Sequence, residues 1–235
     1  MARKAKHRRG LLPSQRTRKV VTPLTDRRVY SFTCHKCESN IECGSDPELY
    51  TCIILAADNR VMRFYEQPQP MYWVDETGKT RRHTPDFEVT YTDNKVNVYE
   101  VKPAARARAY EERTQQAIEH YASLNKTYQI LDERFWSRQP LLANSFNLWR
   151  QGIKHVNPGL PLALASIFEY QNPKTLRELE LAADKHIESR DDLLHMAVNG
   201  YFTLDLESEL ISGDTRILSS TAFPLRRDGT SSAGT

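Results

Sequence analysis

The sequence of 235 residues is poor in glycine, which removes two nucleotide-binding motifs from consideration. It contains nine glycines, and no two of them are spaced as G-x-G. The dinucleotide fingerprint needs that spacing for its tight turn, and the P-loop pattern G-x-x-x-x-G-K-[ST] is absent as well. We therefore do not expect a Rossmann-type or P-loop nucleotide site.

Two further absences concern metalloproteases and membranes. The seven histidines are never closer than nine residues apart, so the H-E-x-x-H pattern is missing. No apolar run approaches the roughly 18–20 residues that a membrane span needs.

The first 25 residues are rich in Arg and poor in acids, as in a transit peptide or a nuclear signal, but lack the apolar stretch of a secretory signal. We expect a cytosolic protein.

Cysteine is also scarce, and its four positions leave two interpretations open. Cys34 and Cys37 form a C-x-x-C pair, with Cys43 and Cys52 as potential partners in a zinc site. The gap between the pairs is only five residues and the second pair is C-x8-C, which is unusual spacing for zinc. Cys52 also stands in an apolar helical run, where a buried thiol is ordinary core. Both zinc and a reduced core thiol remain open.

Charge is nearly balanced in total, yet divided along the chain. The formal net charge is +3, but residues 1–28 carry ten basic side chains and one acid. Residues 160–215 carry eleven acids and four bases. A basic N-terminal arm suits a polyanion, whereas the acidic C-terminal part suits a different partner.

The pattern along the chain predicts four segments. Residues 1–28 form a basic disordered arm, and 29–154 a first domain with one or two strands before Ile41 and a helix starting near Ser45. Three or four antiparallel strands follow between residues 61 and 103, with turns at DETG and TDNK. One helix is expected over 104–124, a strand over 127–133 and a helix over 141–151.

A linker at 155–161 leads to the C-terminal segment. There, three short helices, a turn and two strands over 160–220 are the order of a winged-helix unit, and 221–235 is a flexible tail.

The chemically informative segment is Pro85-Asp86, thirteen residues, and then Glu100-Val101-Lys102. Glu100 and Lys102 are two apart on one strand, so their side chains share a face. The hairpin with its turn at Thr92–Lys95 can bring Asp86 opposite that pair. Two carboxylates reaching one point bind a hard cation such as Mg²⁺, and a neighbouring lysine can orient an attacking water. The alternative is a solvated hairpin with charges on its outer face.

Glu48 also has two interpretations. It stands three residues after Ser45, as in a capping box in which Ser45 is the N-cap. A helical acid ahead of the strands is, however, the order of elements in the PD-(D/E)xK nucleases. Glu42 is the alternative acid if the register is shifted.

The run from Glu48 to Pro103 resembles TnsA, the endonuclease subunit of Tn-seven-like heteromeric transposases. The motifs that carry the resemblance are the helical Glu48, the turn Glu66-Gln67-Pro68, the run from Gly78 to Phe87, and Glu100 to Pro103. The resemblance implies an α/β fold with a PD-(D/E)xK restriction-endonuclease-like core, a mixed sheet flanked by helices, and a small C-terminal winged-helix-like domain. Gly44 to Pro47 depart from the family's usual residues before this glutamate, and Glu100 replaces the Gln of some members.

The resemblance also implies a catalytic set and a cofactor. Glu48, Asp86, Glu100 and Lys102 match the catalytic positions, and Mg²⁺, with Mn²⁺ as a substitute, would be held by Glu48, Asp86, Glu100 and Val101. Side chains expected to contact DNA are Gln67, Lys79, Arg81, Arg82, Arg106, Arg108, Arg8 and Arg9, with solvated surface or turn roles as the alternatives.

The implied function is cleavage of the non-transferred strand at the 5′ ends of a transposon, beside a TnsB-like transposase in the bacterial cytoplasm, close to the nucleoid. The acidic C-terminal domain is expected to dock a TnsC-like AAA+ ATPase rather than to read DNA. Two alternatives remain: a stand-alone restriction or repair nuclease, and a non-catalytic adaptor with a relic nuclease fold.

Overall fold

The computed structural model describes residues 29–37, 39–107 and 111–221, and all structural statements here concern these residues. Their centre is a four-stranded mixed sheet in the order β3-β6-β7-β8, made of β3 (Val61–Glu66), β6 (Phe87–Tyr91), β7 (Val96–Val101) and β8 (Thr127–Leu131). The pairs β3–β6 and β6–β7 are antiparallel, and β7–β8 is parallel. The parallel pair is possible because α3 (Glu111–Ser123) supplies the crossover. The predicted mixed sheet flanked by helices is confirmed.

One face of the sheet is covered by α1 (Asp46–Ala57), which begins where the sequence predicted. The Ser45 side chain accepts a hydrogen bond from the backbone N–H of Glu48, as an N-cap does. All residues from Thr51 to Ala57 are buried, which explains why the helix is apolar on nearly every side. It packs against Phe64, Phe87 and Tyr99 of the sheet in the first hydrophobic core.

The opposite face is covered by α3. Val98 and Tyr99 are neighbours on β7, and they belong to different hydrophobic clusters because successive strand residues point to opposite faces. Val98 packs with Ala117 and Tyr121 of α3 and with Tyr128 of β8. The rings of Tyr121 and Tyr128 are stacked, with centroids 5.8 Å apart. This second layer makes the sheet the middle of a sandwich.

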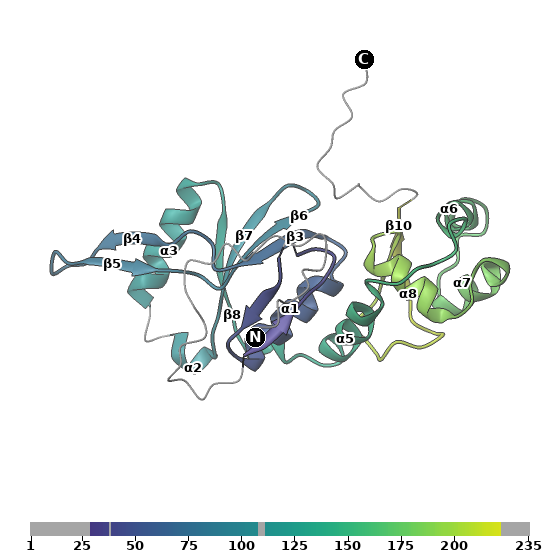
Figure 1. Cartoon of the computed structure of the whole chain (residues 1–235), viewed down its shortest axis with the longest axis horizontal. Helices are drawn as coiled ribbons and strands as arrows, with labels where there is room; N and C mark the ends of the chain where they lie inside the picture. The colour runs from purple at the N-terminus through teal and green to yellow at the C-terminus, as the bar shows by residue number, and fades with distance from the viewer. Residues whose placement is uncertain (1–28, 38, 108–110, 222–235) are drawn as a thin grey trace, which may run out of the picture.

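Two short hairpins accompany the sheet. Strands β1 (Tyr30–Phe32) and β2 (Ile41–Cys43) pair antiparallel beside α1. Strands β4 (Met71–Val74) and β5 (Thr80–His83) pair antiparallel and project from the left end of the molecule in Figure 1. The segment from 61 to 103 thus holds five strands, β3 to β7, where three or four were predicted.

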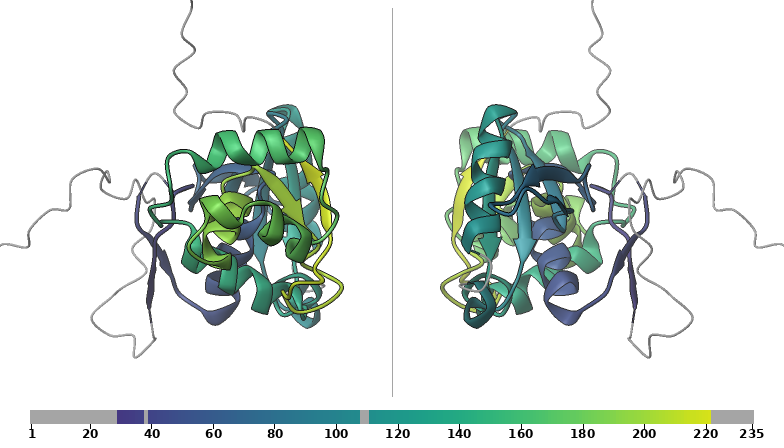
Figure 2. Two further views of the ribbon diagram at one scale, coloured as in Figure 1. Left: turned by 90° about the vertical axis from the view of Figure 1, so that its right-hand side faces the viewer. Right: turned by 90° about the vertical axis from the view of Figure 1, so that its left-hand side faces the viewer.

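The C-terminal part is mainly helical. It contains α4 (Glu133–Trp136), α5 (Leu141–Gln151), α6 (Leu160–Tyr170), α7 (Leu176–Ala182), the 3-10 turn η2 (Asp184–His186) and α8 (Arg190–Val198). They are followed by the antiparallel pair β9 (Phe202–Leu204) and β10 (Ile217–Ser220). Figure 2, left, looks onto this part, with the green helices beside the yellow strand pair. Over residues 160–220, the three helices α6, α7 and α8 are followed by two strands, which is the predicted order.

The helix predicted over 104–124 differs in detail. Residues 104–107 form α2 (Ala104–Ala107) and 111–123 form α3, while 108–110 lie outside the described residues, as do the predicted arm 1–28 and tail 222–235. No helix within the described ranges has the length and apolar character needed to cross a bilayer.

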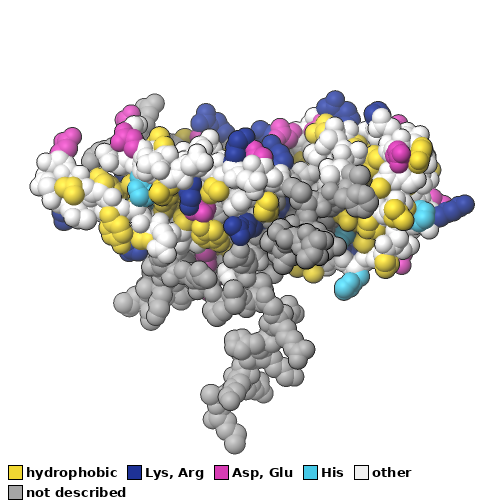
Figure 3. All heavy atoms as spheres, turned by 90° about the horizontal axis from the view of Figure 1, so that it is seen from above, with side chains coloured by type: hydrophobic (Ala, Val, Ile, Leu, Met, Phe, Trp, Pro, Cys, Tyr) yellow, Lys and Arg dark blue, Asp and Glu magenta, His cyan; other side chains and the backbone are white. Residues whose placement is uncertain are grey.

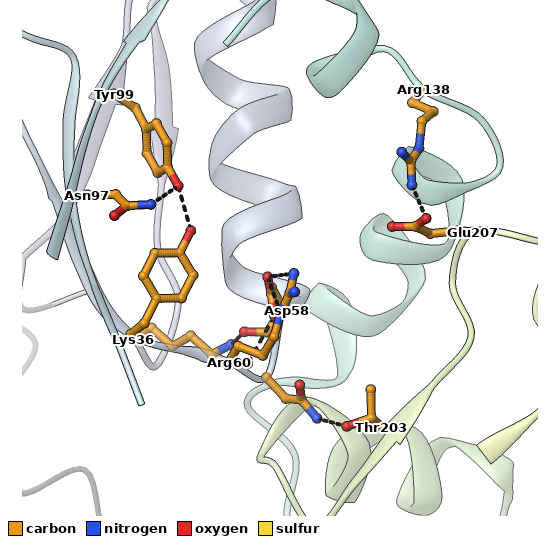
Figure 4. A network of polar contacts seen from close by, with 10 residues as sticks. Lys36, Asp58, Arg60, Asn97, Tyr99, Arg138, Thr203 and Glu207 are labelled. Atoms are coloured by element: carbon orange, nitrogen blue, oxygen red, sulfur yellow. Dashed lines mark hydrogen bonds and ion pairs between the residues drawn. The ribbon is translucent and has the colours of Figure 1, made fainter. Parts of the chain in front are cut away.

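Helix α5 belongs to both hydrophobic cores. Trp149 stacks on Phe32 at 5.1 Å in the first core, whereas its neighbour Leu148 is buried in the second, C-terminal core. Ala57, the last residue of α1, also packs in the second core. Near this junction Asn59 donates a hydrogen bond to the Thr203 hydroxyl (2.7 Å), and Arg138 pairs with Glu207, as Figure 4 shows for the labelled residues. The first and second cores are therefore in direct contact.

Candidate active site

Asp86 is fixed at the start of β6 by backbone hydrogen bonds on both sides. Its N–H donates to the Tyr99 carbonyl at 3.0 Å, and its carbonyl accepts from Gln67 N–H at 2.8 Å. Its carboxylate Oδ2 accepts the N–H of Val101 at 2.7 Å. Oδ1 takes no hydrogen bond from the described residues. The carboxylate is thus held beside the end of β7 with one oxygen available.

The electrostatic surroundings of Asp86 join it to the other predicted site residues. Burial raises the pKa of Asp86 to about 6, opposed by the hydrogen bond from Val101. The charge of Glu48 adds to the rise, while Lys102 and His83 oppose it. Asp86 therefore lies within electrostatic reach of acidic and basic groups from α1, β5 and the end of β7.

Glu48 is the third residue of α1, and its side chain contacts the residues that cap the helix. Its Oε1 accepts the Ser45 hydroxyl at 3.0 Å, and its Oε2 accepts the N–H of Gly44 at 2.8 Å. The capping interpretation of Glu48 is confirmed, with Gly44 rather than Ser45 as the backbone donor. The alternative acid, Glu42, lies on β2 opposite Ser31. The catalytic role of Glu48 stays a prediction.

Glu100 is buried among basic side chains from three elements. Only 4% of its surface is exposed. Lys102, which follows β7, forms a close ion pair with Oε1, as expected for residues sharing a strand face. Arg113 of α3 lies 3.5 Å from the same oxygen, and His83 of β5 lies 3.2 Å from Oε2. The carboxylate thus lies at the meeting point of β5, β7 and α3.

His83 and Arg113 are functional candidates that sequence reasoning missed. His83 stands inside the run from Gly78 to Phe87, beside the more strongly basic Arg81 and Arg82, and its position alone does not distinguish it. Its burial, at the end of a strand whose other residues are exposed, marks it in the structure. Arg113 is one basic residue of a helical stretch, and no local pattern distinguishes it.

The donor set suits a hard cation, but the ligands are engaged elsewhere. Carboxylates of Glu48, Asp86 and Glu100 and the carbonyl of Val101 are oxygen donors of the kind Mg²⁺ prefers. Across 29–37, 39–107 and 111–221, no three His, Cys, Asp or Glu side chains are arranged to hold a metal ion. Glu48 caps its helix and Glu100 contacts basic groups. A cation would have to draw these carboxylates from their present partners.

The predicted DNA-contacting residues fall into three environments. Lys79 and Arg82 are exposed on the β4–β5 hairpin, while Arg81 of that hairpin donates to Asp75 Oδ2 at 2.6 Å. Arg106 is exposed on α2. Gln67 is only 9% exposed and has a φ of 47°, which favours the turn role over an outer surface. Arg108, Arg8 and Arg9 lie outside the described residues.

The four cysteines stand as two pairs in the first core. The sulfurs of Cys34 and Cys37 are 2.8 Å apart, and those of Cys43 and Cys52 are 3.6 Å apart. All four are buried and none forms a disulfide. The expectation that Cys52 is a core residue of the apolar helix is confirmed.

The candidate site lies apart from a cavity of about 940 Å³. That cavity is formed between the end of α1, helices α4 and α5, and the β9–β10 pair. Its lining does not include Asp86, Glu100 or Lys102.

One comparison with known protein families matches the part of the chain that contains the sheet. Residues 58–133 match the family model described as TnsA-like endonuclease N terminal. The matched segment includes Asp86, Glu100, Lys102, His83 and Arg113, and it begins ten residues after Glu48. Among curated proteins, no match was found.

Proposed function

Because the chain carries a TnsA-like endonuclease N-terminal domain, we propose that it is the metal-dependent endonuclease subunit of a cut-and-paste transposase. It cleaves the non-transferred strand at the 5′ ends of the transposon, beside a TnsB-like transposase. The observation that carries the proposal is the convergence of Asp86, Glu100 and Lys102 at the adjoining ends of β6 and β7, inside the segment matched to an endonuclease family.

Each site residue has a role in this proposal. Asp86, Glu48, Glu100 and the Val101 carbonyl would hold Mg²⁺ or Mn²⁺. The bound cation supplies Lewis-acid polarisation of a phosphoryl oxygen and acidification of a water. Lys102 orients the attacking water and neutralises charge that develops on the phosphate. Among these ligands, Asp86 is the one best oriented for a cation, because the Val101 N–H already holds its carboxylate.

The β4–β5 hairpin is the surface we assign to DNA near the site. It leads directly into the site, since β5 ends at His83 and Asp86 follows three residues later. Lys79 and Arg82 are exposed on it, and Arg106 of α2 follows Lys102 by four residues. Phosphate contacts from these side chains would position the duplex without reading its sequence. Arg81 is less suited to a phosphate contact, because its guanidinium already pairs with Asp75.

The C-terminal helices are assigned to protein docking, in a winged-helix-like arrangement with a TnsC-like ATPase as the partner. Large apolar side chains are exposed on two of these helices: Leu162 (70%) and Tyr170 (77%) on α6, and Leu181 (75%) on α7. Exposed apolar groups are typical of interaction surfaces. Acidic and basic side chains are interspersed over the described part of the face drawn in Figure 3.

The test is strand-specific mapping of cuts at transposon ends, with the chain, TnsB-like and TnsC-like partners, and Mg²⁺. Asp86→Ala and Lys102→Ala should reduce 5′-strand cutting to a low residual rate, leaving most insertions joined to donor DNA as cointegrates. Electrostatic assistance of several kcal/mol corresponds to a loss of at least about 100-fold. Asp93→Ala and Lys95→Ala, at the far end of the same hairpin, are matched controls and should cut normally.

Two outcomes would overturn the proposal. Simple insertions at the normal rate with Asp86→Ala would support the non-catalytic adaptor. Efficient cleavage of arbitrary DNA by the purified chain without its partners would support a stand-alone nuclease.

A further inference from the structure

Glu100 has more basic neighbours than its own charge requires. Lys102 alone neutralises it, yet Arg113 lies 3.5 Å from Oε1 and His83 lies 3.2 Å from Oε2. The His83 ring is fixed in turn, because Tyr128 lies at hydrogen-bonding distance (3.3 Å) and packs edge-on against it. The surplus of basic groups needs a reason beyond neutralising one carboxylate.

The second observation is that α3 does not need Arg113 to attach to the sheet. Ala117 is fully buried, and Tyr121 stacks on Tyr128. These contacts lie one and two turns further along α3 and form an apolar cluster of their own. Placing an arginine with a side chain only 20% exposed beside them costs desolvation, and a purely structural helix would avoid that cost.

The third step concerns Lys102. A lysine held in a buried ion pair with Glu100 is not available to orient water or to contact a phosphate. If it leaves, the buried charge of Glu100 must be offset by the bound cation and by the basic groups that remain beside the carboxylate. Arg113 faces the same oxygen as Lys102, is permanently charged, and presents a rigid set of N–H donors.

We propose that Arg113 and His83 are positioning residues for strand cleavage, which hold the Glu100 carboxylate while Lys102 leaves it to act on the substrate. The inference rests on the proposed endonuclease function. Arg113 faces Oε1 and His83 faces Oε2 at ion-pair distance, so the carboxylate keeps basic partners when its lysine partner departs. Neither residue touches the reacting atoms in this scheme.

The experiment measures single-turnover cleavage by the assembled system with Arg113→Gln, Arg113→Lys and Arg134→Gln. Arg113→Gln should lower the cleavage rate at saturating DNA by about 10- to 100-fold, the usual effect of removing an outer partner of a metal ligand. The DNA concentration for half-maximal rate should change less than about twofold. Arg113→Lys should recover most of the rate. Arg134→Gln is the matched control, since Arg134 is exposed and pairs with Asp132, away from Glu100.

A double variant separates positioning from a general structural effect. If Arg113 acts through Glu100 and Lys102, then Arg113→Gln combined with Lys102→Ala should cut no more slowly than Lys102→Ala alone. Should Arg113→Gln fail to fold, His83→Gln gives the same test at Oε2, with a loss of several fold expected. Its folding is checked by circular dichroism.

The outcomes distinguish this inference from the proposed function. Normal rates for both Arg113→Gln and His83→Gln, with Asp86→Ala inactive, would overturn the positioning role and leave the endonuclease intact. Equal losses in rate and DNA binding, with no recovery by Arg113→Lys, would also overturn it. Absence of metal-dependent cutting by the unaltered assembly would instead overturn the proposed function.

Discussion

The N-terminal sheet buries charged side chains, whereas the C-terminal helices keep theirs near solvent. Among the described residues, the buried charged or titratable polar groups before α2 include Lys36, Glu66, His83, Glu88 and Glu100. Past α3 the corresponding residue is Asp192, which caps α8 together with Ser189. The Arg177–Asp214 ion pair of the C-terminal part is largely exposed, and in the pairs Arg190–Glu180 and Arg216–Asp205 the arginine is exposed.

The two regions therefore differ in how their charged side chains affect the free energy of folding. Exposed pairs contribute little in either direction, about 0–1 kcal/mol. A buried group loses its hydration, and removing one partner leaves the other charge uncompensated. Buried charges therefore cost desolvation free energy in the sheet, at the proposed site. The exposed charges of the C-terminal helices cost little.

The largest expected effect is on the free energy of unfolding when Glu100 is removed. Glu100→Ala leaves Lys102 and Arg113 without their carboxylate, and such a loss costs about 3–5 kcal/mol. Asp214→Ala removes the acid from an exposed pair and should cost less than about 1 kcal/mol. Urea unfolding followed by circular dichroism measures both. Equal losses would contradict the distinction between the two regions.

The second prediction uses two aspartates whose effects on stability should have opposite signs. The pKa of Asp86 is raised to about 6 by burial, so its ionisation weakens the fold as pH rises from about 4 to 6. Asp86→Asn should therefore be more stable than the unaltered chain at pH 7, by roughly 3 kcal/mol, in buffer free of divalent metal. The advantage should disappear near pH 4.

Asp192 is the contrasting case. Burial alone would raise its pKa, but hydrogen bonds from Lys154 and from the N–H groups of Glu188 and Ser189 hold that pKa below its usual value. Its ionised form therefore stabilises the fold above pH 4, and this stability is lost as pH falls further. Asp192→Asn should lose about 1–2 kcal/mol at pH 7. Shifts of the same sign in both variants would contradict the comparison.

The smallest effects are expected at the two helix caps. Ser45→Ala and Ser189→Ala should each cost about 1 kcal/mol, the usual contribution of an N-cap side chain. Only Ser45 also donates to Glu48, so only Ser45→Ala should additionally slow DNA cleavage. Thermal unfolding and the strand-cutting assay together decide this. Slower cutting by Ser189→Ala would place the C-terminal helices closer to the chemistry than we propose.

The sequence predicted elements well where local signals were strong. Helix α5 has the predicted bounds, α1 starts at its Ser45 cap, and the β6–β7 hairpin turns at the TDNK segment. The count of strands between 61 and 103 was less accurate. Strands β4 and β5 form a separate pair rather than extending the main sheet, and the polar residues of β5 lack the alternation of a buried strand.

The candidate site was only partly predictable for a topological reason. Glu100 and Lys102 share a strand, so their spacing alone placed them together. Arg113 approaches through the crossover helix between β7 and β8, and His83 through a hairpin outside the main sheet. Their approach to Glu100 depends on how the layers of the fold pack together. It therefore cannot be read from the spacing of residues along the sequence. The burial of His83 and Arg113 is likewise a property of the assembled fold.

Helix α5 has a practical consequence for dissecting the chain. Leu148 and Trp149 are adjacent, but one completes the C-terminal core and the other the N-terminal core. A fragment ending after residue 154 would keep both residues while leaving Leu148 and Ala57 uncovered. An apolar patch exposed in this way promotes aggregation. Loss of cutting by a shortened chain could then result from aggregation as well as from loss of catalytic residues. Single substitutions therefore assign the roles of residues more clearly than truncations do.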